Sequence, residues 1–397
     1  MPDKVPPPPR LYSIDLLRGT VMILMALDHV RDYFSNMLWA NPTDLSKVTP
    51  AYFLTRWVTH LCAPVFILLA GVGASLAEER GKTKPQLAWF LLTRGLWLVW
   101  LELTITRISF YFSFDFTVTQ CLVMWTIGWS MVILAGLCYL PRWAVLTFGL
   151  LLIFGHNATD DINGVIFGPF KWLWVILHDS SDNNVFIHLG HGFRLMAPYK
   201  IIPWCGVMAV GYAMGPIWRM ERARRRKILV LIGCLTNLVF VVIRDINRYG
   251  DPEPWVVRPG GMIWTYLSYF NCEKYPPSLD YLLMTLGPAF IALALFDREP
   301  GPIARRVTVF GRVPLFFYVL HLPLIHGLAC VASYLSYREV LLWLRSPPQF
   351  AAGPFSYGYS LPFVYCTWIL VLLMLYLPCI WFAEEKRRDR SGWLSYL

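Results

Sequence analysis

The sequence is poor in charged residues for its length. Charged side chains make up 15% of the 397 residues, whereas hydrophobic residues make up 56% and the mean hydropathy is +0.49. Ordinary soluble domains contain about a quarter charged residues, so this composition excludes a chain of soluble domains, whose water-facing surface it could not cover. The apolar runs at residues 63–77 and 368–382 indicate a polytopic helical membrane protein.

The signatures of disulfide frameworks and of common soluble enzymes are also missing. The nine cysteines are scattered without C-x-x-C spacing, and only Cys272 falls in a stretch that we place outside the membrane, which excludes a disulfide framework. There is no Walker loop, G-x-S-x-G elbow, H-E-x-x-H motif or G-x-G-x-x-G motif. The net charge of +10 comes from short basic blocks between apolar spans, a pattern that sets membrane topology and excludes a nucleic-acid partner.

The apolar segments predict an all-α helical bundle. A bilayer core about 30 Å thick requires roughly 20 helical residues, which predicts about ten transmembrane helices in a single domain at 13–383, between a Pro-rich tail at 1–12 and a basic tail at 384–397. The predicted spans are 13–35, 52–77, 86–109, 118–140, 143–156, 200–218, 228–244, 280–297, 307–334 and 361–383. The fifth span, 143–156, competes with the tryptophan-rich segment 164–178, and we expect one to cross and the other to lie in the membrane interface.

Basic residues determine the predicted orientation. The strongest blocks are at 222–227 and 386–390, and with ten spans both lie in the cytoplasm together with both termini, as the positive-inside rule requires. The first span is too long for a removable signal peptide and lacks an A-x-A-like cleavage site, so we interpret it as a retained signal anchor. The sequence therefore predicts a multi-pass protein of the inner (cytoplasmic) membrane.

The first span is the richest in ionisable residues, which cost a few kcal/mol each at membrane depth. Arg18 and His29 are eleven residues apart, three helical turns or about 16 Å, and therefore lie on one helix face. Asp15 joins that face. With the amino terminus inside, Arg18 lies near the cytoplasmic surface and His29 in the outer half. A neutral imidazole is the usual general base, and Asp28 or Asp32 is the candidate carboxylate to orient it.

Other spans contain further histidines. His60 reaches a depth similar to that of His29 if the first two helices pack as a hairpin, and His321 lies at the middle of the ninth span. Both are candidates to assist the base. The competing interpretation is that these imidazoles only bond to neighbouring helices. His188 and His191 have i, i+3 spacing in a long outer loop, but loop histidines are usually solvated, so we predict no metal site.

Four segments carry a family resemblance. RLYSIDLLRGTVMILMALDH, THLCAPVFILLAGVGASL, YKIIPWCGVMAVGYAMG and GRVPLFFYVLHLPLIH resemble bacterial members of the heparan-α-glucosaminide N-acetyltransferase catalytic-domain family. This family was formerly a domain of unknown function and is one of a broader set of transmembrane acyltransferases. The most specific pieces are S-I-D-x-L-R-G and P-L-F-F-Y-x-L-H. The spacing of Arg18 and His29 also reproduces the R-x10-H pattern of the related acyltransferase-3 proteins.

The resemblance implies acyl transfer, in this family acetyl transfer, from cytoplasmic acyl-CoA to a sugar or glycan acceptor on the outer side. Arg18, Arg94 and Arg312 lie near inner helix ends, where with Asp15 they would form the acyl-CoA site through charge-assisted contacts to the phosphates. There is one departure from the family. In the lysosomal enzyme the histidine thought to act in catalysis lies between the first two spans, whereas residues 35–59 contain no histidine here.

Two alternatives stay open at this point. A proton-coupled transporter or flippase would use Asp15, Arg18, Asp28, His29 and Arg244 as a pathway through the bundle, although the sequence shows neither an internal repeat nor paired broken helices. A family member that has kept the fold and lost the activity is the second alternative. The expected partners are the lipid bilayer, acyl-CoA and the acceptor, and the sequence leaves a homo-oligomer open.

Overall fold

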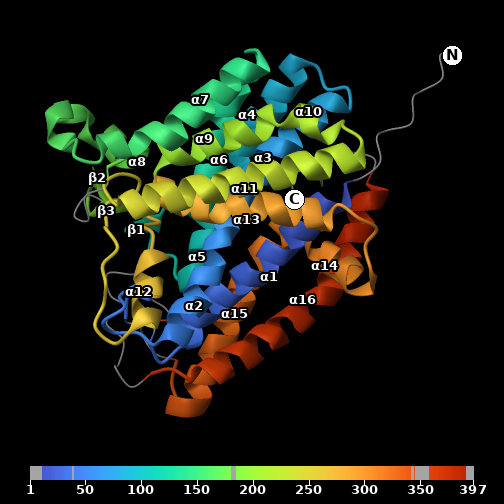
Figure 1. Ribbon diagram of the computed structural model, residues 1–397. Helices are drawn as coiled ribbons and strands as arrows, with labels where there is room; N and C mark the ends of the chain where they lie inside the picture. Colours follow the sequence, from blue (N-terminus) through green and yellow to red (C-terminus); the bar gives the residue numbers. More distant parts are fainter. Residues whose placement is uncertain (1–10, 38–39, 180–184, 341–343, 345–356, 390–397) are drawn as a thin grey trace.

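The computed structural model describes residues 11–37, 40–179, 185–340, 344 and 357–389. This part of the chain is mostly helical, with one small sheet (Figure 1). The helices are α1 (Tyr12–Phe34), α2 (Pro50–Val58), α3 (Cys62–Glu79), α4 (Lys84–Leu101), α5 (Arg107–Tyr111), α6 (Val123–Leu137), α7 (Arg142–Gly155), α8 (Lys171–Leu177), α9 (Ile201–Ala213), α10 (Gly215–Trp218), α11 (Arg222–Ile246), α12 (Met262–Tyr269), α13 (Leu279–Phe296), α14 (Pro302–Arg312), α15 (Pro314–Tyr337) and α16 (Leu361–Arg388).

Shorter elements connect or interrupt these helices. They are the 3-10 helices η1 (Thr59–Leu61), η3 (His156–Thr159) and η4 (Gly164–Phe170), the π-helical turn η2 (Glu102–Thr106), and the strands β1 (Val118–Gln120), β2 (Phe186–Gly190) and β3 (Phe193–Met196). β3 is the middle strand of the sheet, parallel to β1 and antiparallel to β2. The sheet therefore joins two loops that are far apart in the sequence.

Each of the ten predicted spans coincides with helix, but the helices differ in length. Six segments in the described part of the chain are long and apolar enough to cross a membrane. They are Pro50–Glu79, Lys84–Tyr111, Arg222–Ile246, Leu279–Phe296, Pro314–Tyr337 and Leu361–Arg388. The predicted helical membrane protein is thus confirmed in outline, whereas the count of ten and the positions of the termini stay predictions.

The ninth predicted span, 307–334, is wrong as a single helix. The chain breaks at Val313, which has φ −130° and ψ 52°, because the α conformation is disfavoured for the residue before a proline and Pro314 begins α15. Arg312 consequently ends α14 instead of lying inside a membrane-spanning helix. The segment 164–178 is also divided, into η4 and α8, with a non-helical Gly168 in η4.

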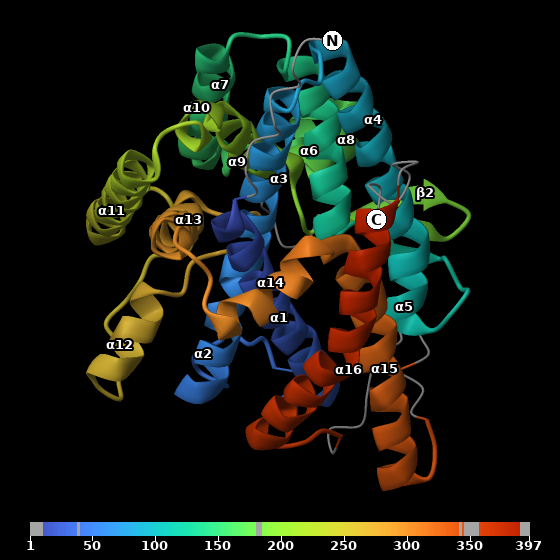
Figure 2. The same ribbon diagram turned by 90° about the vertical axis from the view of Figure 1, so that its right-hand side faces the viewer.

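The loops gather at two opposite ends of the bundle. We call the end with the sheet, η3, η4, α8 and α12 the loop end, and the end with the α3–α4, α6–α7, α9–α11 and α13–α14 connections the arginine end (Figures 1 and 2). Ion pairs stabilise these connections at the arginine end. Glu78 binds Lys84 across the α3–α4 connection at 2.7 Å, and Arg225 of α11 binds Asp297, which directly follows α13, at 2.7 Å. At the loop end, the Asn271 side chain donates a hydrogen bond to the Thr43 carbonyl.

Helix α1 lies in the interior and contacts α3, α13, α14, α15 and α16. Its closest partner is α14, because both helices have a glycine at the contact. A Cβ on Gly19 would lie 2.2 Å from the Val307 carbonyl oxygen, and one on Gly311 would lie 1.9 Å from the Asp15 carbonyl oxygen. This packing fixes the amino-terminal half of α1, which bears Arg18.

Candidate functional site

Two cavities in the molecule adjoin each other along α1. The arginine-end cavity has a volume of about 410 Å³ and the loop-end cavity about 340 Å³. Phe66, Val123 and Tyr318 line both, so these three side chains form the wall where the cavities meet. Arg18 lines the first cavity and His29 the second. The two residues that the sequence places on one face of the helix therefore serve adjacent compartments.

The arginine-end cavity combines three guanidinium groups with an apolar wall. Arg18 comes from α1, Arg94 from α4, and Arg80 directly follows α3. The Arg18 Nη1 lies 3.9 Å from the Asp15 carboxylate and 3.4 Å from the Gly311 carbonyl oxygen, so the α1–α14 contact positions this side chain. Arg80 was not among the sequence candidates. Arg312, which was, is not among the residues lining either cavity.

The loop-end cavity is lined by more charged residues, and Asp28 is central to them. Its Oδ1 lies 2.8 Å from the Arg31 Nη1 and accepts a hydrogen bond from the Thr59 hydroxyl, while its Oδ2 lies 2.5 Å from the Arg56 Nη1. These contacts join α1 to α2. They occupy both carboxylate oxygens, so Asp28 binds two arginines in this structure, and its role as the carboxylate that orients His29 stays a prediction.

His29 opens into the loop-end cavity with 17% of its side chain exposed. Its Nδ1 lies 3.9 Å from the Asp32 Oδ2, which is too long for a hydrogen bond but close enough for electrostatic attraction. The rings of His29 and His321 have centroids 5.2 Å apart. His321 donates from Nδ1 to the Tyr318 carbonyl at 2.6 Å, so the neutral ring has its lone pair on Nε2. The structure thus brings two candidate imidazoles together, with a half-exposed carboxylate nearby.

His60 lies apart from this pair. It is buried, its ring packs on Tyr281 with centroids 5.3 Å apart, and it is not among the residues lining either cavity. The Tyr281 hydroxyl donates to the His60 carbonyl oxygen at 2.8 Å. These contacts indicate that His60 packs η1 against α13. His188 and His191, the weak metal candidates, are exposed on the β2–β3 hairpin.

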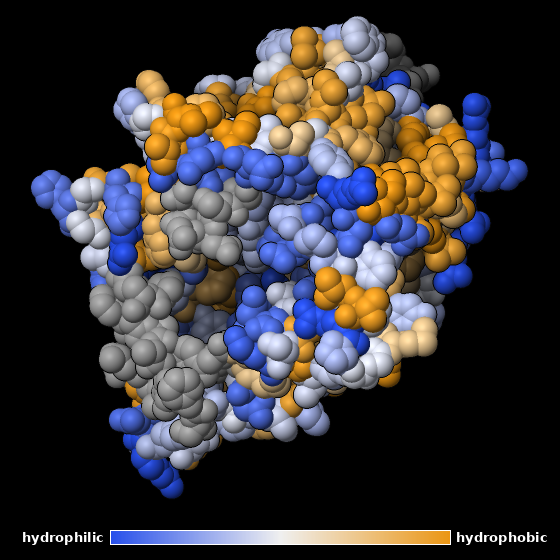
Figure 3. Space-filling model, turned by 60° about the vertical axis from the view of Figure 1, so that its left-hand side comes forward, coloured by the Kyte–Doolittle hydropathy of each residue, from blue (hydrophilic) through white to orange (hydrophobic). Residues whose placement is uncertain are grey.

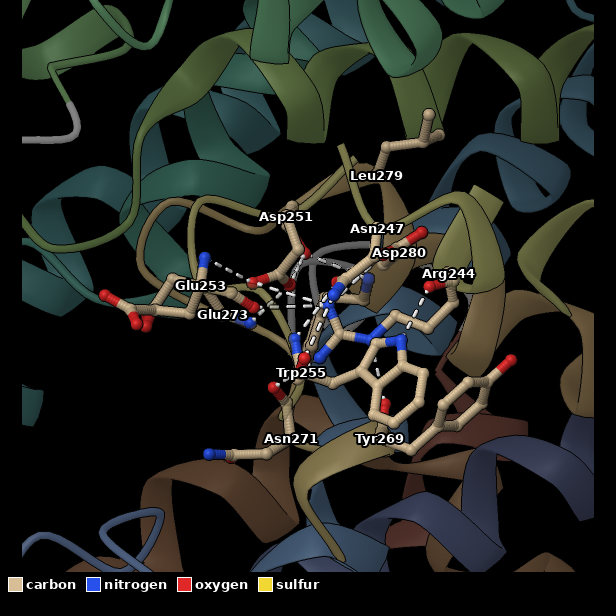
Figure 4. A network of polar contacts seen from close by, with 12 residues as sticks. Arg244, Asn247, Asp251, Glu253, Trp255, Tyr269, Asn271, Glu273, Leu279 and Asp280 are labelled. Carbon is tan, nitrogen blue, oxygen red and sulfur yellow. Dashed lines mark hydrogen bonds and ion pairs between the residues drawn. The ribbon is translucent and has the colours of Figure 1, made fainter. Parts of the chain in front are cut away.

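Arg244 organises the part of the loop end between α11 and α13 (Figure 4). Its guanidinium donates to the backbone carbonyls of Glu253, Ser268, Tyr269 and Asn271 and to the Asp280 carboxylate. The Asp251 carboxylate in turn accepts hydrogen bonds from the Glu273 backbone amide and the Ser278 hydroxyl. This network holds a long loop in place, so Arg244 has a structural role at the loop end.

That loop contributes two residues to the loop-end cavity, Lys274 and Tyr275. Lys274 is buried, and its ammonium lies over the rings of Tyr199 and Tyr275, 5.8 and 5.2 Å from their centroids. Burial raises the pKa of Tyr275, but the positive charges of Lys274 and Arg56 outweigh it, and the pKa lies below its ordinary value. The environment of this tyrosine is therefore strongly positive.

Sequence reasoning missed several of these cavity residues. The i, i+3 spacing of Asp28 and Arg31 on α1 was a usable signal. No such spacing was available for Arg56, because its partner Asp28 lies on another helix. Lys274 had none either, because it lies in a loop whose course depends on the network around Arg244.

The surface agrees with a membrane protein that has a polar site at one end. Figure 3 looks toward the loop end, where hydrophilic residues gather across the middle of the face and hydrophobic patches flank them. The exposed apolar residues of the long helices include Leu231, Leu235, Leu238, Leu373 and Leu377. Such side chains face lipid at low cost and water at high cost, which supports a bilayer as the surroundings of the bundle.

Comparison with known proteins identifies the family. A model of the family described as heparan-alpha-glucosaminide N-acetyltransferase, catalytic, matches residues 10–244. The chain belongs to this family. The match runs from α1 through most of α11 and includes Arg18, Arg94 and His29, but not the loop that carries Lys274. Comparison with curated proteins returns no match. Membership and the apolar helices together indicate an acetyltransferase of the membrane.

Proposed function

We propose that the protein transfers an acetyl group from acetyl-CoA in the arginine-end cavity to a sugar amine or hydroxyl in the loop-end cavity. The observation that carries this proposal is the shared wall of Phe66, Val123 and Tyr318 between a cavity with three arginines and a cavity with His29. Donor and acceptor can meet there without either crossing the bundle.

The donor fits the arginine-end cavity by charge and by shape. Arg18, Arg80 and Arg94 would bind the phosphates of CoA through charge-assisted hydrogen bonds. The apolar wall, with Met22 and Leu69, suits the pantetheine arm. Arg18 and His29 are separated by about 16 Å along α1, a distance that an extended pantetheine arm spans. By the positive-inside rule, we place the arginine end in the cytoplasm.

The chemistry that we propose is direct transfer. His29 accepts a proton from the acceptor nitrogen or oxygen as that atom attacks the thioester carbonyl carbon. The new C–N or C–O bond forms, the C–S bond breaks, and the proton on His29 passes to the departing CoA thiolate. The Asp32 carboxylate stabilises the imidazolium across 3.9 Å, and His321 packs against it. Holding both reactants at one wall supplies much of the acceleration.

The test is an acetyl-transfer assay with radiolabelled acetyl-CoA and glucosamine on the purified protein in detergent or nanodiscs. His29→Ala should lower kcat by about 10²–10⁴-fold, the usual contribution of a general base, with unchanged thermal unfolding. His188→Gln, which changes an exposed histidine of strand β2, is the matched control and should retain full activity. Wild-type rates in His29→Ala would remove His29 from the mechanism.

A second pair of variants tests the donor site. Arg94→Gln should raise the KM for acetyl-CoA by about tenfold or more, as expected for the loss of a charged hydrogen bond. Arg222→Gln, which removes an exposed arginine of the same end paired with Glu299, should not change it. Equal KM values for both variants would place CoA elsewhere, and uptake into proteoliposomes without acetyl-CoA would favour a transporter.

A further inference from the structure

A third cavity lies at the arginine end, between α1, the α13–α14 connection and α14. Its volume is about 560 Å³, larger than either cavity of the candidate site, and it shares no lining residue with them. Leu16 of α1, Phe296 of α13, and Ile303 and Val307 of α14 give it an apolar wall. Arg298 of the connection also lines it. The cavity therefore combines an apolar space with a cation.

The carboxylates of the α13–α14 connection do not balance that cation, because each is already bound to another arginine. Asp297 accepts hydrogen bonds from the buried Arg225 at 2.7 and 2.9 Å. Glu299, which also lines the cavity, lies 3.2 Å from Arg222. Arg298 is exposed between these two carboxylates and forms no ion pair within the described residues. The rim of the cavity consequently keeps a positive charge.

Helix α14 adds two more arginines to this rim. The Arg305 Nε donates to the Pro300 carbonyl at 3.1 Å, and Pro300 lines the cavity. Arg306 follows Ile303 by three residues, so both lie on the same side of α14. Arg305 and Arg306 are exposed, and neither forms an ion pair with another residue that the structure describes. The apolar wall is thus bordered by guanidinium groups that are available to an anion.

Helix α14 has the features of a helix in the membrane interface. Its 11 residues extend over about 16 Å, too short for a bilayer core of about 30 Å. Its buried residues include Phe310 and Gly311, whereas 77% of Ile303 is exposed beside the two arginines. Exposed apolar residues next to cations are typical of helices that lie on an anionic leaflet. Figures 1 and 2 show α14 at the arginine end, beside α1 and α16.

We propose that this third cavity binds an anionic phospholipid of the cytoplasmic leaflet. One acyl chain lies against Phe296 and Val307, and the phosphate binds Arg298 and Arg305 through charge-assisted hydrogen bonds. A free anion would leave the apolar wall in contact with water, which is costly. A lipid without net charge would leave the positive charge of the rim unbalanced. Only an anionic amphiphile suits both parts of the cavity.

The experiment measures lipid binding to delipidated protein in a neutral detergent by native mass spectrometry. Wild type should bind dioleoyl phosphatidylglycerol about tenfold or more tightly than dioleoyl phosphatidylcholine. The double variant Arg298→Gln/Arg305→Gln should bind phosphatidylglycerol about 25-fold more weakly, about fivefold for each cation removed. Ile303→Asn should weaken the binding of both lipids, because it makes the apolar wall polar.

The matched control is Arg224→Gln/Lys227→Gln, which removes two exposed cations at the start of α11. It should bind phosphatidylglycerol as wild type does, and an equal loss of affinity in both double variants would show unspecific attraction and overturn the site. Equal affinities of wild type for the two lipids would also overturn it, and this comparison depends on no variant. Binding of inorganic phosphate as tight as that of phosphatidylglycerol would identify a free anion as the ligand and overturn the lipid assignment. Because the assay contains neither acetyl-CoA nor acceptor, its outcome is independent of the proposed acetyl transfer.

Discussion

Asp28→Asn is the sharpest test of how the charges of the loop-end cavity are balanced. The carboxylate binds Arg31 at 2.8 Å and Arg56 at 2.5 Å and accepts from Thr59 at 2.9 Å, with 14% of the side chain exposed. Asparagine keeps the size and one acceptor oxygen but removes the charge. Arg31 retains Asp32, so Arg56 is the group left without a carboxylate.

The expected loss of stability in Asp28→Asn follows from these contacts. Breaking a buried ion pair by removing one partner costs about 3–5 kcal/mol. Because Asp28 lines a cavity and Arg31 keeps a second partner, we expect Asp28→Asn to lower the free energy of unfolding by the smaller end of this range, about 3 kcal/mol. Arg56→Met alone leaves Asp28 paired with Arg31 and should cost less. The double variant should lose less free energy of unfolding than the two single variants lose together, and the difference, the coupling energy, should be about 1–3 kcal/mol.

The measurement is equilibrium unfolding in mixed detergent micelles, followed by tryptophan fluorescence, for the wild type, both singles and the double. Asp44→Asn removes a carboxylate of the same end that pairs with exposed Lys47 and should unfold like the wild type. Additive effects of Asp28→Asn and Arg56→Met, or an unchanged Asp28→Asn variant, would refute the assignment of Asp28 as the shared counterion.

Two further changes test other parts of the molecule. Gly311→Ala places a Cβ 1.9 Å from the Asp15 carbonyl oxygen and should destabilise the α1–α14 contact by about 1–3 kcal/mol, whereas Gly301→Ala, which meets open space, should leave the thermal unfolding temperature unchanged. Arg244→Met leaves Asp280 without its cation and should expose the 247–278 loop to limited proteolysis under conditions where wild type resists it.

Periodicity predicted those parts of the site that lie on one helix. Eleven residues separate Arg18 from His29, and in the structure the two side chains line adjoining cavities. The break of the ninth predicted span was also readable, because Val313 precedes a proline. Spacing also favoured Asp32, three residues after His29, over the adjacent Asp28, but only the positions of Arg31 and Arg56 show that both Asp28 oxygens are already bound.

Residues whose position depends on tertiary contacts could not be predicted. Arg56 reaches Asp28 because α2 packs beside α1, a pairing that no local pattern encodes. Lys274 reaches the cavity because Arg244 binds four backbone carbonyls and the Asp280 carboxylate. Loop residues have no periodicity to reveal which way they face, so this side of the loop-end cavity was visible only in the folded chain.

The polar groups of the loop end are of two kinds, those that form ion pairs with one another and those that do not. Ionisable groups at membrane depth persist only where something offsets their desolvation. For Asp28, Arg31 and Arg56, ion pairs with one another offset the cost of desolvation. These ion pairs also hold α1 against α2. Within the described residues, Lys274 forms no ion pair and its ammonium lies over the rings of Tyr199 and Tyr275, and His29 has no hydrogen bond on Nδ1. Since both line the same cavity, they are polar groups that a molecule in this cavity can contact without breaking one of these ion pairs.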